Sequence, residues 1–152
     1  MATTAATFSS RSQSTAAQSL SVSSGAVVLS ARLLFALIFL MSGPMHFSGQ
    51  TIAFAASQGV PLAPIAVPIS GALASAGGLS ILLGYRAKIG AWLLILFLAA
   101  VTPLMHAFWA VSDPMAHQLQ FVMFMKNLSM LGGALLITQL GSGPWSLDAR
   151  GK

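Results

Sequence analysis

Few side chains in this sequence could take part in chemistry, and several of them lie at the edge of long apolar stretches or inside them. His46 follows the first apolar stretch, and His106 lies near the end of the third. His117 precedes the fourth stretch, which itself contains Lys126 and Asn127. Imidazole, ammonium and amide groups all form hydrogen bonds with carbonyl or hydroxyl oxygen atoms. Because polar groups are costly in apolar surroundings, we expect a ligand-binding site. Its candidate residues are His46, His106, Lys126 and Asn127.

A methionine lies beside each histidine, at Met45, Met105 and Met115. A thioether next to an imidazole suits copper(I), and His46 with His106 could hold a haem between them. Methionine also fills irregular gaps in apolar cores, which accounts for eight methionines in so apolar a chain. We therefore expect neither haem nor copper, and we assign no metal ligand and no catalytic residue.

Four apolar stretches must position these side chains. They cover residues 26–45, 62–83, 89–111 and 119–140, and each holds 20 or more residues. At a rise of about 1.5 Å per residue, each stretch can cross a hydrocarbon core of roughly 30 Å as a helix. None has the charged face of a soluble helix, and the mean hydropathy of the chain is +0.84. The sequence predicts an all-α integral membrane protein, folded as a four-helix bundle.

The basic residues indicate how these spans cross the membrane. They are scattered singly, without the run or stripe that binds nucleic acid. The loops at residues 46–61 and 112–118 contain no lysine or arginine, whereas basic residues flank the other segments: Arg11, Arg86, Lys88, Arg150 and Lys152. The positive-inside rule then places both termini in the cytoplasm. We expect a protein of the bacterial cytoplasmic (inner) membrane, with its histidines in the outer leaflet.

The segments outside the spans are short. Residues 1–24 are rich in Ser, Thr, Ala and Gln, and we expect a disordered cytoplasmic tail. Residues 25–143 form the membrane domain, with a short interfacial helix over residues 48–58 between the first two spans. Residues 144–152 form a cytoplasmic C-terminal tail. The second span is rich in Gly and Ala, which predicts close helix packing, and Pro103 should bend the third.

Two charged residues lie at membrane depth. Arg32 lies six residues into the first span, about 9 Å from its cytoplasmic end. We expect it to be a structural membrane charge whose long side chain reaches back to the inner headgroups. Lys126 lies roughly 10 Å below the outer end of the fourth span, where it either reaches outward or has a partner. Its neighbour Asn127 should form a hydrogen bond to another helix.

Five motifs follow one another along the chain: "ARLLFALIFLMSGPMHF", "GGLSILLGYRAKIGAWLL", "PLMHAFW", "FMKNLSMLGGALLI" and "GSGPWSLDA". Together they resemble the DoxX family of small bacterial membrane proteins over about Leu29 to Ala149. The resemblance implies a four-helix membrane bundle, and some DoxX members are subunits of quinone-linked or thiol-linked oxidoreductase assemblies. By position, the resemblance implies that the characteristic residues of the family correspond to Arg32, His106, Lys126, Asn127 and the closing Ser146, Leu147 and Asp148.

Two positions depart from the DoxX pattern. Members often have Lys at the position of His46 and Glu at the position of Ala74. With Ala74 the four spans hold no carboxylate, so a proton relay built on a membrane carboxylate is in doubt.

Two functions are favoured by these observations. The resemblance and the polar outer layer favour an accessory or anchor subunit of a quinone-linked or thiol-linked membrane oxidoreductase, with His106 and Lys126 binding the quinone carbonyls. The alternative is a non-catalytic membrane module that binds a lipid or small hydrophobic ligand, or organises partners. The absence of cysteine favours this alternative, because any dithiol chemistry would belong to a partner.

A small transporter is the third and weakest reading, because no inverted halves are visible. No autonomous catalytic constellation is visible either, so the sequence leaves open whether the chain is an enzyme. The expected partners are the lipid bilayer, other oxidoreductase subunits or a second copy of the chain, and not nucleic acid.

Overall fold

A computed structural model describes residues 24–150 of the chain. Every regular element in this range is a helix. Four stretches within it are long and apolar enough to cross a membrane: Ser24–Phe47, Ala63–Leu83, Ala87–Ala110 and Pro114–Leu140. The sequence therefore predicted the all-helical class and the four candidate spans correctly. The expected disordered tail lies outside the described residues, apart from Ser24.

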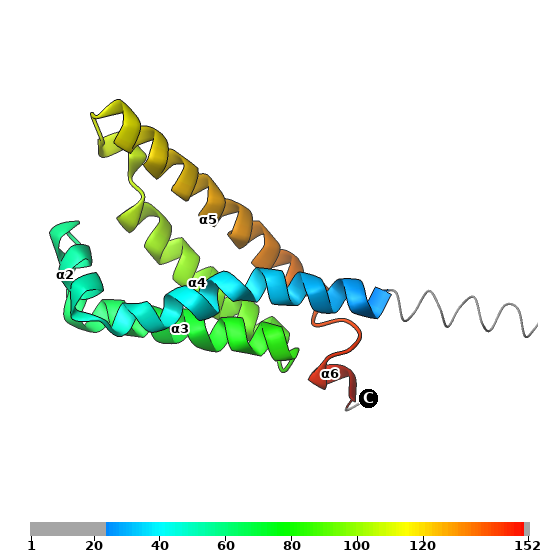
Figure 1. The fold of residues 1–152 in the computed structure, drawn as a ribbon. Helices are drawn as coiled ribbons and strands as arrows, with labels where there is room; N and C mark the ends of the chain where they lie inside the picture. Colours follow the sequence, from blue (N-terminus) through cyan, green and yellow to red (C-terminus); the bar gives the residue numbers. More distant parts are fainter. Residues whose placement is uncertain (1–23, 151–152) are drawn as a thin grey trace, which may run out of the picture.

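The elements follow one another with short connections (Figure 1). The first helix covers residues 24–42 and continues directly into a 3-10 helix. The remaining elements are η1 (Gly43–Phe47), α2 (Gly49–Ser57), α3 (Ala63–Leu83), α4 (Ala87–Met105), η2 (Phe108–Ala110), α5 (Pro114–Leu140) and α6 (Leu147–Arg150).

The fourth span begins earlier than its apolar stretch suggests. The side chain of Asp113 accepts a hydrogen bond of 2.8 Å from the backbone N–H of Ala116, and Pro114 occupies the first helical position. A carboxylate N-cap followed by proline is a strong helix start. Residues 114–118, which include the polar His117 and Gln118, thus belong to α5, although their mean hydropathy resembles that of a loop.

Glycines set the distance between the helices at the end of the molecule near α6. A Cβ atom on Gly77 of α3 would lie 2.8 Å from the carbonyl oxygen of Gly90 in α4. A Cβ atom on Gly133 of α5 would lie 2.8 Å from the ring of Phe35 in the first helix. Backbones and rings come this close only because these positions lack side chains. The Gly-rich second span therefore packs tightly against its neighbours.

The core lies where α4 meets its neighbours. Helix α4 packs against both α3 and α5. The largest fully enclosed side chains are those of Phe39, Ile81, Leu94 and Leu98. Phe39 meets Phe97 edge to face, with ring centroids 6.2 Å apart. This core ties the first helix, α3 and α4 together at mid-length.

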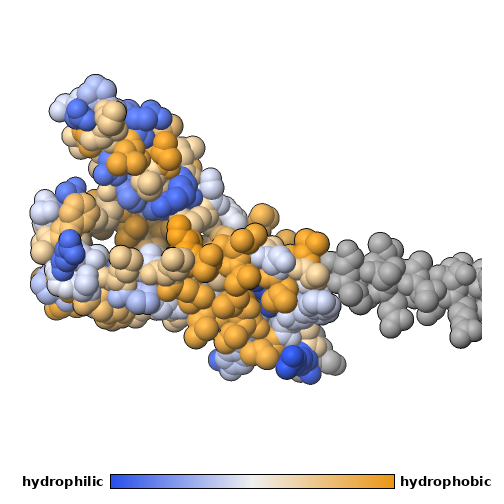
Figure 2. Space-filling model, viewed as in Figure 1, coloured by the Kyte–Doolittle hydropathy of each residue, from blue (hydrophilic) through white to orange (hydrophobic). Residues whose placement is uncertain are grey.

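Towards the end that carries α2, the α4–α5 hairpin diverges from α3 and the first helix (Figure 1). The space-filling view is hollowed between this hairpin and the α2 region (Figure 2). The start of the first helix, the α3–α4 turn and α6 lie together at the opposite end. The helices are thus in close contact at one end of the molecule and diverge at the other.

Large apolar side chains cover much of the outer surface. Leu34, Leu62, Met115 and Leu140 are each more than two-thirds exposed, and hydrophobic residues dominate the flank of the first helix (Figure 2). Such a surface would be an aggregation hazard in water, but it matches the acyl chains of a bilayer.

Candidate functional site

A cleft of about 240 Å³ lies between the first helix, η1, α4 and α5. It brings together all four candidate ligand-binding residues of the sequence analysis in otherwise mainly apolar walls. The lining residues are Ile38, Phe39, Ser42, His46, Phe97, Val101, Met105, His106, Lys126, Asn127 and Met130.

His46 is positioned by the break at the end of the first span. Pro44 lies in the first turn of η1, and the tighter helix turns His46 towards α3 and α4. His46 can lie this close to α3 because residue 71 is a glycine: a Cβ atom on Gly71 would lie 2.6 Å from the Cβ atom of His46. The imidazole Nδ1–H donates to the carbonyl oxygen of Ser42 at 2.9 Å. The ring also meets Phe97 edge to face, with centroids 5.8 Å apart, so its orientation is held on two sides.

His106 is positioned by the end of α4. Its backbone N–H donates to the carbonyl oxygen of Thr102 at 3.1 Å, which closes the helix three residues after Pro103. Its imidazole Nδ1–H donates to Oε1 of Gln120 in α5 at 2.8 Å. The sequence analysis missed Gln120. The only available signal was its position in a polar segment that proved to be helical.

Lys126 and Asn127 are adjacent in α5, and adjacent helical residues point in directions about 100° apart. Asn127 is 5% exposed and faces the cleft, whereas Lys126 is exposed and its Nζ contacts Sδ of Met123 at 3.4 Å. The expected hydrogen bond from Asn127 to another helix is absent among the described residues. Asn127 instead presents a buried amide to the cleft.

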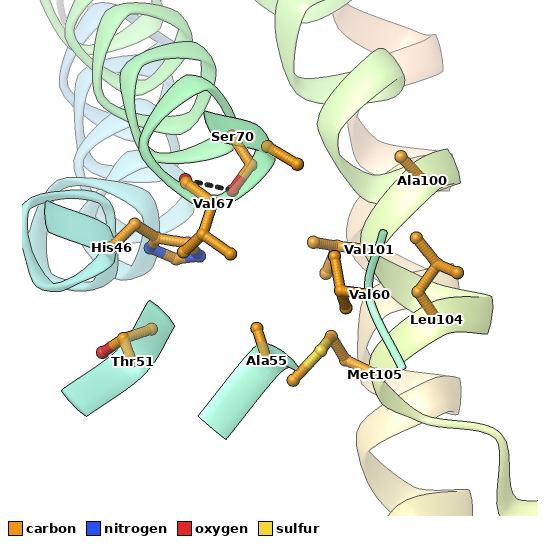
Figure 3. Close-up of a pocket in the computed structure, with 11 residues that line it drawn as sticks. His46, Thr51, Ala55, Val60, Val67, Ser70, Ala100, Val101, Leu104 and Met105 are labelled. Atoms are coloured by element: carbon orange, nitrogen blue, oxygen red, sulfur yellow. Dashed lines mark hydrogen bonds between the residues drawn. The ribbon is translucent and has the colours of Figure 1, made fainter. Parts of the chain in front are cut away.

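A second cavity of about 120 Å³ adjoins the cleft (Figure 3). His46, Val101 and Met105 line both spaces. The other walls come mainly from α2, α3 and α4 and are mostly apolar. Ser70 is polar, but its hydroxyl already donates to the carbonyl oxygen of Val67 at 2.7 Å. The two spaces together form a cleft that contains a few polar groups and, beside it, an apolar extension.

Two other polar residues at this end, His117 and Asp113, do not line the cleft. The His117 ring packs edge to face on Phe108, with centroids 5.6 Å apart. Asp113 is used as the N-cap of α5. Within residues 24–150, His, Cys, Asp and Glu side chains form no group of three or more that could hold a metal ion.

Arg32 lies at the opposite end of the molecule, where its side chain is buried. It is 5% exposed, and its Nη2 donates to the carbonyl oxygen of Trp145. The nearby Gly84 has no side chain and a φ of +63°, and a Cβ atom there would collide with Nη1 of Arg32. The folded-back C-terminal segment thus supplies Arg32 with a partner within the protein, an interaction that the sequence analysis did not predict.

Asp148 joins the same segment to the α3–α4 turn. Its carboxylate accepts hydrogen bonds from the backbone N–H groups of Arg86 at 2.9 Å and Ala87 at 3.3 Å. Its own backbone N–H donates to the carbonyl oxygen of Gly84 at 2.9 Å. These contacts cap the start of α4 from a distant part of the chain. The residues at this end thus hold distant parts of the chain together.

The fold and the cleft define a class: integral membrane proteins of four apolar helices that present polar groups to a cleft between the helices. Residues 22–152 match the family model for the SURF4 family, and the chain belongs to that family. The chain is similar to inner membrane protein YqjF of Escherichia coli (strain K12), with 36% identity over 123 residues, or 80% of this chain and 88% of the relative.

A second relative is inner membrane protein YphA of the same strain. It is 30% identical over 127 residues, which cover 82% of this chain and 89% of the relative. No solved structure matches the chain. The chain is an integral inner membrane protein of the SURF4 family.

The resemblance to the DoxX family was wrong, since the family model assigns the chain to the SURF4 family. Many of the motif residues that suggested it serve packing and capping, such as Gly77, Gly133 and Asp148. Those roles recur wherever membrane helices pack closely. Ala74, one of the two departures from the DoxX pattern, is fully buried in the core next to Phe39 and Ala91, where a glutamate has no room.

Proposed function

We propose that this protein is a membrane module that binds a small aromatic ligand of the quinone or quinol class in the cleft. The observation that carries the proposal is the meeting of His46, His106, Lys126 and Asn127 in otherwise mainly apolar walls. Ligand pockets typically combine an apolar lining with a few polar groups that fix orientation.

The size and walls of the cleft favour a single substituted ring. At about 240 Å³ it lies below the roughly 300–1,000 Å³ of pockets for drug-sized ligands. Phe39 and Phe97 contribute aromatic walls against which a flat ring packs. The adjoining apolar cavity accepts a substituent of the ring.

The second candidate is an accessory or anchor subunit of a quinone-linked oxidoreductase assembly. The same cleft favours it, because a quinone-binding module becomes useful to an enzyme when a partner exchanges electrons with the quinone. The chain has no cysteine, so a thiol-linked reaction would also draw its thiols from a partner. In both proposals the termini are cytoplasmic and the cleft lies in the outer leaflet.

A binding measurement tests the first candidate. The probe is a benzoquinol with a decyl chain, titrated anaerobically into the purified protein in detergent. His106→Ala removes a polar group of the cleft and should weaken binding about tenfold, the effect of one lost hydrogen bond of about 1.4 kcal/mol. The matched control is His117→Ala, which removes the same side chain outside the cleft and should leave the Kd unchanged. Equal affinities for the wild type and both variants would end the proposal.

A further inference from the structure

Nδ1 of each imidazole of the cleft faces an oxygen atom that accepts a hydrogen bond. Nδ1 of His46 faces the backbone carbonyl oxygen of Ser42 at 2.9 Å, and a carbonyl can only accept. Nδ1 of His106 faces Oε1 of Gln120 at 2.8 Å, which is also an acceptor. In each neutral ring the proton is therefore on Nδ1, and Nε2 carries a lone pair.

These two Nε2 atoms are open. Within residues 24–150, the fully enclosed side-chain nitrogen and oxygen atoms without a partner all belong to Arg32. Since Nε2 of His46 and Nε2 of His106 have no partner in that range, they are accessible from outside the protein. The cleft is the space that both rings line.

The amide of Asn127 completes the pattern. It is 95% buried, has no hydrogen-bond partner among the described residues, and lines the same cleft. It offers both an N–H donor and a carbonyl acceptor. The residues that line the cleft thus include two imidazoles with Nε2 as an acceptor and one amide that can both donate and accept.

We infer that the ligand carries hydroxyl donors and is a phenol or hydroquinone in preference to a quinone; this rests on the proposed function above. A hydroxyl group donates to Nε2 of a histidine and accepts from the N–H of Asn127 at the same time. A quinone carbonyl only accepts, so it leaves both imidazole nitrogens unpaired in mainly apolar surroundings. An unpaired buried acceptor costs about as much as a typical hydrogen bond gains.

The test compares three probes on one ring: tetramethylhydroquinone, its quinone and its dimethyl ether. The full chain is titrated anaerobically in lipid nanodiscs at about pH 8. The hydroquinone should bind about tenfold or more tightly than either of the other two probes. The dimethyl ether keeps the ring and both oxygen atoms but replaces each hydroxyl hydrogen with a methyl group, so it has no donor.

Gln120→Leu tests the tautomer argument separately. Without Oε1 of Gln120, His106 is free to carry its proton on Nε2 and to donate to a carbonyl, so the preference for the hydroquinone should fall. Gln118→Leu is the matched control, because Gln118 is an exposed residue of α5 outside the cleft. It should keep the wild-type preference, and thermal unfolding of both variants shows whether they remain folded.

The outcomes separate this inference from the proposed function. Tighter hydroquinone binding, reduced by Gln120→Leu, supports the inference. Quinone binding that equals or exceeds hydroquinone binding overturns it and leaves the proposed function in place. A preference that survives Gln120→Leu overturns the role of the His106 tautomer. The absence of binding by all three probes overturns the inference and the proposed function together.

Discussion

Asn127 holds an unusual position, since a buried amide without a partner destabilises the ligand-free protein. Asn127→Leu replaces it with an apolar side chain of similar size. We expect the ligand-free variant to unfold at a higher temperature, with a gain of about 1–3 kcal/mol in the free energy of unfolding. The same variant should bind the quinone or quinol probe more weakly. A rise in stability together with a loss of affinity would indicate that Asn127 serves binding at the expense of stability.

Lys126→Met is the control for this prediction. Lys126 is the next residue in α5, but its side chain is exposed. Its replacement should change the unfolding temperature little, because the long side chain of Lys126 carries its ammonium group towards the headgroups and leaves little desolvation to relieve. Thermal unfolding of both variants in the same detergent provides the measurement. A destabilised Asn127→Leu variant would contradict the assignment and indicate a structural role for the amide.

A second prediction at the scale of single residues concerns Gly84, which has a φ of +63°. Gly84→Ala adds a Cβ atom that collides with Nη1 of Arg32 and with Ser146. We expect a loss of about 1 kcal/mol or more in the free energy of unfolding. Gly132→Ala is the control, since no atom lies within 4 Å of the added Cβ and alanine favours a helix. An equal response of the two variants would contradict the described contact.

The sequence predicted which polar residues meet in the cleft, because their spacing along apolar stretches sets their depth in the membrane. The sequence did not predict the hydrogen-bond partners of the polar residues, either in the cleft or at the other end of the molecule. Arg32 donates to Trp145, 113 residues away, and no local pattern connects two such distant positions. Adjacent helical residues point in different directions, so the sequence alone did not show that Asn127 is buried while Lys126 is exposed.

At the scale of elements, the helix ends depend on capping carboxylates. Asp113 starts α5 through a residue next to it in sequence, and Asp148 caps the start of α4 from the far end of the chain. The apolar stretches predicted the middles of the helices but not these ends, because hydropathy does not detect a cap. The start of α5 at Pro114 is the clearest example.

Asp148→Ala should loosen the start of α4. The backbone N–H groups of Arg86 and Ala87 lose their acceptor, and caps of this kind contribute about 0.5–2 kcal/mol. We expect faster hydrogen exchange at residues 84–90 and easier proteolysis of the C-terminal segment. Asp113→Ala should instead speed exchange at the start of α5. Unchanged exchange at Arg86 and Ala87 would rule out the capping role.

At the scale of the whole molecule, the α3–α4 turn and the C-terminal segment lie at one end and α2 with the α4–α5 connection at the other (Figure 1). Because the basic residues gather at the first end, we predict that this end is cytoplasmic. Single cysteines at Ala149 and Gln118, both exposed, test it. An impermeant thiol reagent should label intact spheroplasts at Gln118, whereas Ala149 should react after lysis. Labelling at Ala149 in intact spheroplasts would reverse the orientation.

The divergence of the α4–α5 hairpin has a consequence for how the bilayer acts on the protein. Glycine contacts and the Asp148 cap hold the helices together at one end, and we infer that the hairpin pivots there. Helices tilt to match the thickness of the hydrocarbon layer around them. A change in tilt moves α4 and α5 relative to the first helix at the far end and alters the width of the cleft. We therefore expect bilayer thickness to change the occupancy of the proposed ligand, so that the lipid would act as an effector as well as a solvent.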